Sequence, residues 1–228
     1  MTTDDAVSSG FDNLNILTGV STSRDAIVAA NELYEHIYQP DIDLCLFYCS
    51  PEYDLKALGD ELNRLFGEIN LIGCTTSGEI TPVGYLKNSL TGVSLSGDGI
   101  DVVTQRLDDI DQFEISHGSD VTRLLINDLA SQSGVLASSE NTFGFLLIDG
   151  LCGKEEVVVS SVHHGLGSIQ LCGGSAADNE VFSETLLFSD GKFRSNCALL
   201  SLIQLDNPFT VFKTQHFVAS ETKMVVTE

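Results

Sequence analysis

The sequence predicts an α/β fold in which mixed β-sheets are flanked by helices. Short apolar runs typical of buried strands alternate with apolar stripes typical of amphipathic helices. This order of elements also occurs twice, about a hundred residues apart. The two observations together predict two pseudo-repeated halves, each built on a strand–helix–strand unit that is followed by a β-hairpin.

The repeat is clearest in two blocks, 46–76 and 146–176, which align without a gap. Each block contains an apolar run, a helical stretch, the pattern Gly-x-Ile-polar-Leu-x-Gly, and then small residues that include hydroxyl side chains. The apolar helical positions also match across the blocks: Leu58, Leu62 and Phe66 fall opposite Val158, Val162 and Leu166. Pseudo-symmetric bodies often bind ligands where their two copies meet, so we expect a site at that junction.

In the first half, serines that can cap a helix precede the first amphipathic stretch, and Pro40 ends it. The nearly continuous apolar run 42–49 is typical of a strand covered on both faces. The expected elements are, in order, a disordered leader at 1–12, a strand at 14–20, a helix from Ser21 or Ser23 to about 38, a strand at 42–49, a helix at 54–66, a strand at 69–74, an edge strand or loop at 79–85, and a hairpin of 89–96 with 100–106.

In the second half, an acidic connector at 108–118 precedes a helix that Ser119 or Asp120 can cap. The expected elements are that helix to about 131, a Ser-rich linker at 131–141, a strand at 143–148, a helix at 154–166, a strand at 169–172, a hairpin of 185–188 with 193–205, and a strand at 209–218. We therefore divide the chain into a leader (1–12), a first half (13–110) and a second half (111–228). The pattern stops midway at residue 228, as in a truncated protein.

The composition excludes several classes of function. The 228 residues include 33 acidic and 11 basic ones, which gives a net charge of −22. Such a chain has too little positive surface to bind nucleic acid or to dock on an anionic membrane. The six cysteines form no CxxC pair, and we find no signal peptide and no apolar run of about 20 residues. We therefore expect a cytoplasmic protein with six reduced thiols.

Two glycine-rich elbows follow the second strand of each unit and are the candidate ligand site. Glycine allows tight turns and close ligand approach, and free N–H groups and hydroxyls can hold a carboxylate. The alternative is a tight turn before a hairpin. Neither elbow matches a phosphate-binding motif. We expect an amino acid to bind there, with its amine near Asp178 or Glu79. The candidate ligand-binding residues are Gly73, Cys74, Thr75, Thr76, Gly173, Gly174, Ser175 and Asp178.

Other residues allow alternative chemistries. Cys74 follows a strand and could be a nucleophile, and Asp149 could pair with Asp178 as acid and base. The histidines have no HxxxH or HExxH spacing, so a dedicated zinc site is not expected. His163 and His164 fit the C-terminal end of a helix, where a positive charge is favourable. His216 lies on the expected last strand and is either a histidine at the edge of the core or a haem ligand.

The two elbows, Leu71 to Ile80 and Cys172 to Asp178, with the turn Phe188-Ser189-Asp190-Gly191, resemble the N-terminal part of FIST sensor domains. The resemblance covers about residues 14–228, and by comparison with the family we expect the C-terminal FIST segment to be absent. It implies a bacterial or archaeal sensory input module that binds small ligands such as amino acids. Such modules occur alone or linked to histidine kinases, diguanylate cyclases or chemotaxis receptors.

One branch of the family resembles haem-binding nitric-oxide sensors, so haem is a possible cofactor, with His216 as the first candidate for its axial ligand. The resemblance carries over no catalytic residue. We therefore expect a sensory domain and not an enzyme. The alternatives are a cysteine-dependent enzyme that uses Cys74 and a pure interaction domain.

Overall fold

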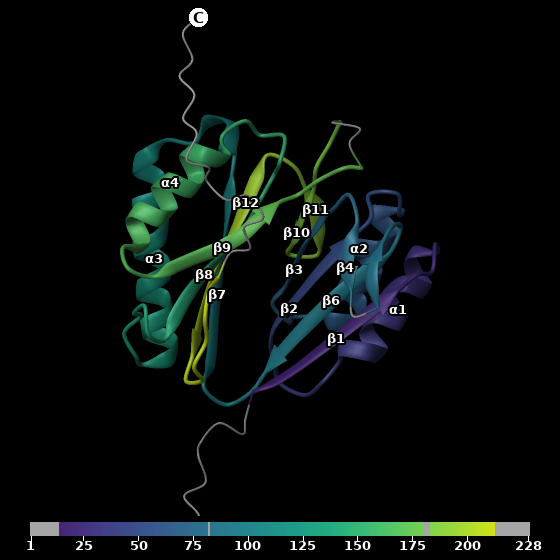
Figure 1. Ribbon diagram of the computed structural model, residues 1–228, viewed down its shortest axis with the longest axis horizontal. Coiled ribbons are helices and arrows are strands. Elements are labelled where there is room, and N and C mark those ends of the chain that lie inside the picture. The colour runs from purple at the N-terminus through teal and green to yellow at the C-terminus, as the bar shows by residue number, and fades with distance from the viewer. Residues whose placement is uncertain (1–13, 82, 180–182, 213–228) are drawn as a thin grey trace, which may run out of the picture.

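The computed structural model of the protein describes residues 14–81, 83–179 and 183–212 (Figure 1). It confirms an α/β fold. The helices are α1 (Ala26–Ile37), α2 (Leu55–Phe66), α3 (Ile115–Ser133) and α4 (Glu155–Leu166), with one 3₁₀ turn, η1 (Ile110–Gln112). The strands are β1 (Asn15–Ser21), β2 (Ile42–Cys49), β3 (Leu71–Thr75), β4 (Glu79–Thr81), β5 (Gly84–Leu86), β6 (Leu90–Ser96), β7 (Ile100–Asp108), β8 (Thr142–Ile148), β9 (Gln170–Ser175), β10 (Leu187–Ser189), β11 (Lys192–Arg194) and β12 (Cys197–Leu205).

The described strands form two large mixed sheets that lie face to face, each with two helices on its outer side (Figure 1). The first sheet has the order β1-β6-β2-β3-β10-β11 and the second has the order β7-β12-β8-β9, while β4 and β5 pair only with each other. One apolar cluster lies between α1, α2 and the first sheet, and another lies between α3, α4 and the second. A third cluster joins the inner faces of both sheets, including Ile72 and Leu199.

The duplication extends well beyond the strand–helix–strand unit. In both sheets, the last long strand of the unit, β6 or β12, is inserted between the first two and runs antiparallel to them. The strands at the third and fourth sheet positions, β2–β3 and β8–β9, form a parallel pair. Thus β1-α1-β2-α2-β3, a hairpin and β6 correspond to β7-α3-β8-α4-β9, a hairpin and β12. Left-handed asparagines, Asn88 and Asn196, lead into β6 and β12 at corresponding points.

Local signals explain the helix ends. The Asp25 carboxylate accepts hydrogen bonds from the N–H groups of Ile27 and Val28, so it caps α1 in place of the expected serines. Both α2 and α4 end at a glycine with positive φ, Gly67 at 58° and Gly167 at 63°. Glycine adopts this conformation without a steric penalty, which explains its presence at the same point of both units.

The start of α3 differs from the sequence prediction. The helix begins at Ile115, so Ser119 and Asp120 lie inside it and are not its caps. Its true start is a capping box in which the Glu114 N–H donates to Nδ1 of His117 at 3.3 Å. A histidine in the third helical position replaces the usual Glu or Gln, which is why the pattern did not reveal this end.

The prediction that 89–96 and 100–106 pair as a hairpin is wrong. β6 pairs with β1 and β2 in the first sheet, whereas β7 pairs with β12 in the second. The Gly97-Asp98-Gly99 turn therefore carries the chain from one sheet to the other, and the second unit begins at β7 and not after residue 110. Likewise, only β11 pairs with β10, and Cys197–Leu205 crosses into the second sheet as β12.

The gapless alignment needs a correction in one strand. Cys49 pairs with Thr75 in the first sheet, and Ile148 pairs with Ser175 in the second. Equivalent residues of the helices and elbows in the two units are therefore 100 positions apart, whereas equivalent residues of β2 and β8 are 99 positions apart. β2 carries a register irregularity near Ile42, and the loop after β8 is one residue longer than the loop after β2.

Two other predicted segments lie at the ends of the chain. The leader at 1–12 falls outside the described residues, and so does most of the strand expected at 209–218, of which 209–212 contain no strand. Among the described residues, no helix is long and apolar enough to cross a membrane.

Candidate functional site

The two elbows meet, as the repeat predicts. The Ala177 N–H donates to the Thr75 carbonyl at 2.9 Å, and the Asn179 N–H donates to Oγ of Ser77 at 3.1 Å. The contact lies just beyond the carboxyl ends of the parallel pairs β2–β3 and β8–β9. In α/β proteins, ligands commonly bind outside the carboxyl ends of parallel strands.

Two adjoining cavities lie at this junction, and Asp178 lines both. The larger cavity has a volume of about 280 Å³, and we call it the junction cavity; the smaller has about 230 Å³. The junction cavity is lined by both units: Pro51, Glu52, Leu55 and Thr75 come from the first, and Asp178, Asn179, Ser183, Glu184 and Leu186 from the second. Its charged lining side chains are all carboxylates, which favours a ligand that carries a positive charge.

The three carboxylates of the junction cavity have different partners. Asp178 is buried and accepts hydrogen bonds from the N–H groups of Ser183, at 2.6 Å, and Glu184, at 3.1 Å. It therefore holds the loop in shape. Glu52 and Glu184 are exposed, and among the described residues Glu52 accepts one long hydrogen bond from a side chain, that of Asn179, at 3.5 Å. Sequence reasoning missed both glutamates, since neither belongs to a glycine-rich elbow.

The first elbow contributes fewer donors than the sequence suggests. Gly73, Cys74 and Thr75 lie within β3, which pairs with β2 on one side and with β10 on the other. The Thr75 N–H, for example, donates to the Leu186 carbonyl at 2.9 Å. The sheet thus uses the N–H groups that we expected to hold a carboxylate. Thr76 lies beyond the strand, and its hydroxyl donates to Glu79 at 2.8 Å.

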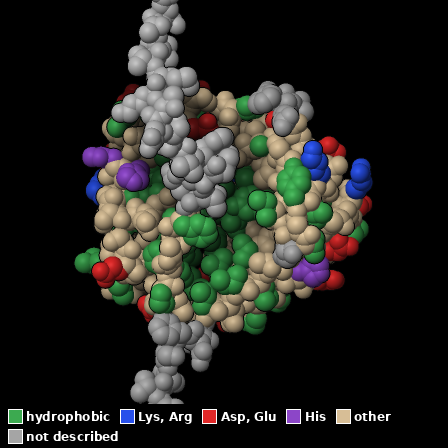
Figure 2. Space-filling view, viewed as in Figure 1, with side chains coloured by type: hydrophobic (Ala, Val, Ile, Leu, Met, Phe, Trp, Pro, Cys, Tyr) green, Lys and Arg blue, Asp and Glu red, His purple; other side chains and the backbone are tan. Residues whose placement is uncertain are grey.

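The second elbow is open to solvent. Gly173, Gly174 and Ser175 are exposed and lie on β9, which forms an edge of the second sheet. They line a cavity of about 720 Å³ between β9 and α4, which we call the β9–α4 groove. Its other lining residues are mostly apolar: Leu146, Ile148, Glu155, Val159, His163, Leu171, Cys172, Val211 and Phe212. Figure 2 shows hydrophobic side chains gathered in a hollow along the middle of the viewed face, between the left and right halves of the molecule.

The alternative acids and bases have structural partners. Asp149 is buried and accepts hydrogen bonds from the N–H groups of Leu151, at 2.9 Å, and Asn196, at 2.6 Å, and from the Thr185 hydroxyl. It therefore fixes the loops around it. Glu79, the other candidate for binding an amine, is 1% exposed and bonded to Thr76 and Ser89.

Cys74 is poorly suited to nucleophilic catalysis. It is 1% exposed, and burial raises the pKa of its thiol to about 12. A thiol with such a pKa is almost wholly protonated at neutral pH, and the thiolate is the reactive form. All six cysteines are free in the structure.

The histidines form no metal site among the residues that the structure describes, where no group of three potential ligands comes together. His163 lines the β9–α4 groove. His164 is exposed in the last turn of α4, as the charge argument predicts. His216, our first candidate for a haem ligand, lies outside the described residues, so its role stays a prediction.

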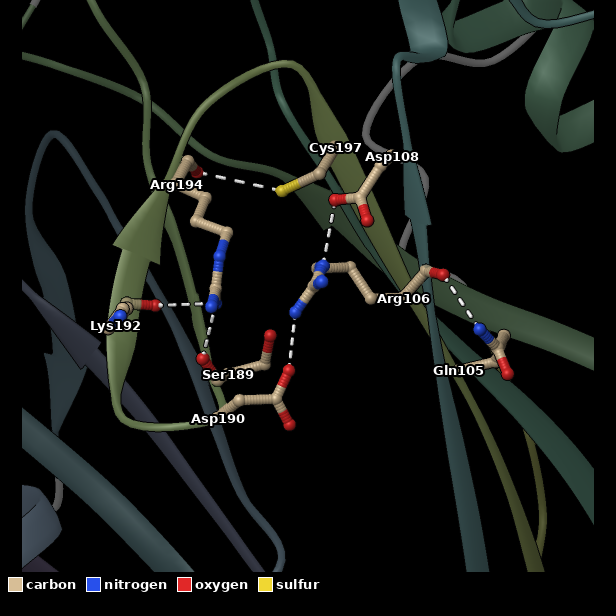
Figure 3. A network of polar contacts seen from close by, with 8 residues as sticks. All are labelled: Gln105, Arg106, Asp108, Ser189, Asp190, Lys192, Arg194 and Cys197. Atoms are coloured by element: carbon tan, nitrogen blue, oxygen red, sulfur yellow. Dashed lines mark hydrogen bonds and ion pairs between the residues drawn. The ribbon is translucent and has the colours of Figure 1, made fainter.

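A third cavity, of about 420 Å³, lies where the hairpin β10–β11 approaches β7. Arg106 on β7 donates to Asp108 at 2.7 Å and also pairs with Asp190 in the turn between β10 and β11 (Figure 3). Arg194 donates to the carbonyls of Ser189 and Lys192 (Figure 3). The Arg106–Asp190 pair ties the hairpin, which belongs to the first sheet, to β7 of the second. Because two carboxylates engage Arg106, it does not form an anion site.

Comparisons with known proteins identify one family. The sequence model of the FIST N domain matches residues 43–228. A search of curated proteins found no match. Among solved structures, the chain is similar to cyanuric acid hydrolase from A. caulinodans, with a TM-score of 0.45 and 10% identity, over 85% of this chain and 72% of that one. That likeness is too weak to carry an argument.

Proposed function

The chain belongs to the FIST family of small-ligand sensory domains, and from that premise we propose that it binds a small amine-bearing ligand, such as an amino acid, in the junction cavity. One observation carries this proposal: among the described residues, the cavity at which the two elbows meet is lined by three carboxylates and by no lysine or arginine. The amine would bind between the exposed carboxylates of Glu52 and Glu184, while Asp178 keeps the loop in place.

The position of the cavity suits a sensor. Its wall combines Glu52 and Thr75 of the first unit with Asp178 and Glu184 of the second. A ligand that contacts both units binds most tightly at one relative position of the two, so binding stabilises that position. A change in the arrangement of the units is then the signal that a partner can detect. We expect that partner to be a signalling protein such as a histidine kinase or a diguanylate cyclase.

Calorimetry of the whole chain against the amino acids and a simple primary amine tests the proposal. Glu184→Gln and Glu52→Gln each remove one negative charge with almost no change of shape, and we expect each to weaken binding about tenfold. Glu140→Gln is the matched control, because Glu140 is exposed in a loop and does not line the junction cavity. The proposal would be contradicted if Glu184→Gln and Glu52→Gln bound as tightly as the wild type and the control. It would also be contradicted if the wild type bound no amine.

Haem binding is the second candidate. Among the described histidines, His163 lines a cavity that is large and mostly apolar, the β9–α4 groove, and His216 remains the candidate from the sequence. Both are tested by the absorption spectrum of protein from haem-supplemented cells. A Soret band that His216→Ala abolishes assigns the ligand to His216, and one that only His163→Ala abolishes assigns it to His163. Absence of the band in the wild type removes haem from the account.

Catalysis is not part of the proposed function. The buried Cys74 thiol and the fully bonded Asp149 lack the exposure that a reacting group needs. We also propose a cytoplasmic location, on the basis of the six free thiols.

A further inference from the structure

The two small hairpins of the molecule occupy equivalent places in the repeat. Each has two strands of three residues, and each precedes the strand that is inserted into its sheet. In β4–β5, the central cross-strand pair is Ile80 with Tyr85. In β10–β11, the central pair is Phe188 with Phe193. The aromatic pair of the second hairpin therefore corresponds to the Ile–Tyr pair of the first.

The hairpin β10–β11 docks on the first unit. Phe188 of β10 pairs opposite Gly73 of β3, so the hairpin of the second unit extends the sheet of the first. The centre of the Phe188 ring is 5.2 Å from that of Phe47 and 5.0 Å from that of Phe193. Only 1% of the surface of Phe188 is exposed. A Cβ on Gly59 of α2 would lie 3.1 Å from Phe188. The β3 edge, Phe47 and Gly59 thus form a socket for the aromatic pair.

The second unit has a corresponding surface beside β9, narrower than the first socket because a valine replaces the glycine, and no described hairpin lies on it. Gly173 pairs with Leu146 as Gly73 pairs with Phe47, and Val159 stands in α4 where Gly59 stands in α2. Gly173, Leu146 and Val159 all line the β9–α4 groove. Within the part of the chain that the structure describes, no strand pairs with the outer side of β9.

The outer side of β9 presents backbone groups suited to strand pairing. The Ala176 N–H donates inward to the Ile148 carbonyl at 2.8 Å. Because backbone groups alternate in direction along a strand, those of Gly173 and Ser175 face outward. In the first unit, the equivalent Thr75 N–H donates to the Leu186 carbonyl beside the docked hairpin. An open strand edge of this kind is a template for a further strand.

The hairpin β4–β5 has exposed apolar side chains and no described sheet edge paired with it. Among the described strands, it pairs with none of either large sheet. Ile80 is 86% exposed, Val83 72% and Tyr85 61%. The apolar pair that corresponds to Phe188 and Phe193 is therefore left in solvent, on a chain whose β9 edge pairs with no other described strand.

We propose that two copies of this chain associate by docking the β4–β5 hairpin of one copy on the β9 edge of the other, with Ile80 and Tyr85 in the β9–α4 groove. The donor and the acceptor are different surfaces, so the contact is head-to-tail. A reciprocal exchange of hairpins closes a two-fold dimer, and each contact repeats the one already made between β10–β11 and β3. The site is distinct from the junction cavity, whose glutamates the contact does not use.

The charge of the chain gives this association a distinctive salt dependence. Two copies that each carry −22 repel one another, and salt screens that repulsion. The proposed contact consists of backbone hydrogen bonds and apolar side chains. Association should therefore strengthen as the salt concentration rises, whereas a contact made of ion pairs would weaken.

Sedimentation of the full chain over a concentration series, at low and high salt, measures the association against the 24.5 kDa of one copy. Ser175→Pro removes an outward N–H from an edge strand, where proline is tolerated, and Ser175→Ala is its control. Val159→Glu places a charge in the groove from a helix and tests the acceptor a second way. Ile80→Glu alters the donor, with Ile80→Val as control. Each disruptive variant should weaken association about tenfold or more, and the controls should not.

A mixture of two defective variants tests the head-to-tail arrangement. Ser175→Pro keeps its hairpin, and Ile80→Glu keeps its β9 edge, so together they can form one intact contact. We expect the mixture to associate more strongly than either variant alone. A wild type that stays at the mass of one copy at every concentration would overturn the proposal. So would association that is insensitive to Val159→Glu and Ile80→Glu, or a mixture no stronger than its parts.

Discussion

The edges of β3 and β9 show how the same unit behaves with and without a docked hairpin. All five residues of β3 are buried, because β10 pairs along its outer side. In β9, by contrast, the corresponding Gly173, Gly174 and Ser175 are exposed. The two strands have similar small residues, and their parallel neighbours, β2 and β8, are equivalent strands of the repeat. Their difference in burial therefore comes from a hairpin that another unit supplies, and not from the strand itself.

Truncating one side chain in each hairpin should give the largest difference in stability between them. Phe188→Ala removes a ring that is 1% exposed and packs on Phe47, and should cost about 3–5 kcal/mol of the free energy of unfolding. Ile80→Ala changes the equivalent residue of β4–β5, which is 86% exposed, and should change that free energy by no more than about 0.5 kcal/mol. Urea denaturation at low protein concentration measures both. Comparable losses would mean that the two hairpins have the same environment.

The two glycines of the second elbow give the next largest difference. A Cβ on Gly173 would lie 1.8 Å from the Leu146 carbonyl oxygen, and φ is +146°, so Gly173→Ala strains the β8–β9 pair. A Cβ on Gly174 meets no atom within 4 Å. We expect Gly173→Ala to cost about 1–3 kcal/mol and Gly174→Ala to be nearly neutral, from thermal or urea unfolding. A stable Gly173→Ala would show that the strand does not need this backbone conformation.

Thiol labelling compares the exposure of β3 and β9 in the unmutated protein, because each strand contains one cysteine. Burial raises the pKa of the Cys74 thiol, on β3, to about 12. Cys172, on β9, is less deeply buried, and its burial also raises the pKa of its thiol. Because the thiolate reacts, labelling should quicken as the pH rises towards the pKa of each accessible thiol. At pH 8 to 9 the native protein should be labelled at Cys172 and Cys152 well before Cys74, as peptide mass spectrometry can follow. Early labelling of Cys74 would contradict its burial in β3.

The sequence predicted the local elements well and their pairing less well. Apolar periodicity identified β2, α2, β3 and their copies, because the burial that produces the pattern is a local property of each element. The partner of a strand is not local. β6 and β7 read as a hairpin since a Gly-Asp-Gly turn joins them, yet each is completed by strands far away in the sequence, so the chain crosses between sheets.

The candidate site follows the same division. Repetition of the elbows correctly predicted that they meet, and Thr75 and Asp178 do line one cavity. The prediction that the N–H groups of Gly73 to Thr75 are free to bind a ligand was wrong, because β10 pairs with β3 and its position could not be read from the sequence. Glu52 and Glu184 reach the cavity from loops, and no spacing in the sequence relates two loops that lie over a hundred residues apart.

Hydrogen exchange of individual backbone amides tests the open β9 edge most directly. At high dilution, the amides of Gly173 and Ser175 should exchange rapidly, while those of Gly174 and Ala176, which face β8, and of Thr75, which faces β10, should be protected. At high protein concentration the Ser175 amide should become protected as the second copy docks. Protection of Ser175 equal to that of Thr75 at every dilution would contradict the account, because the β9 edge would then be covered within a single copy.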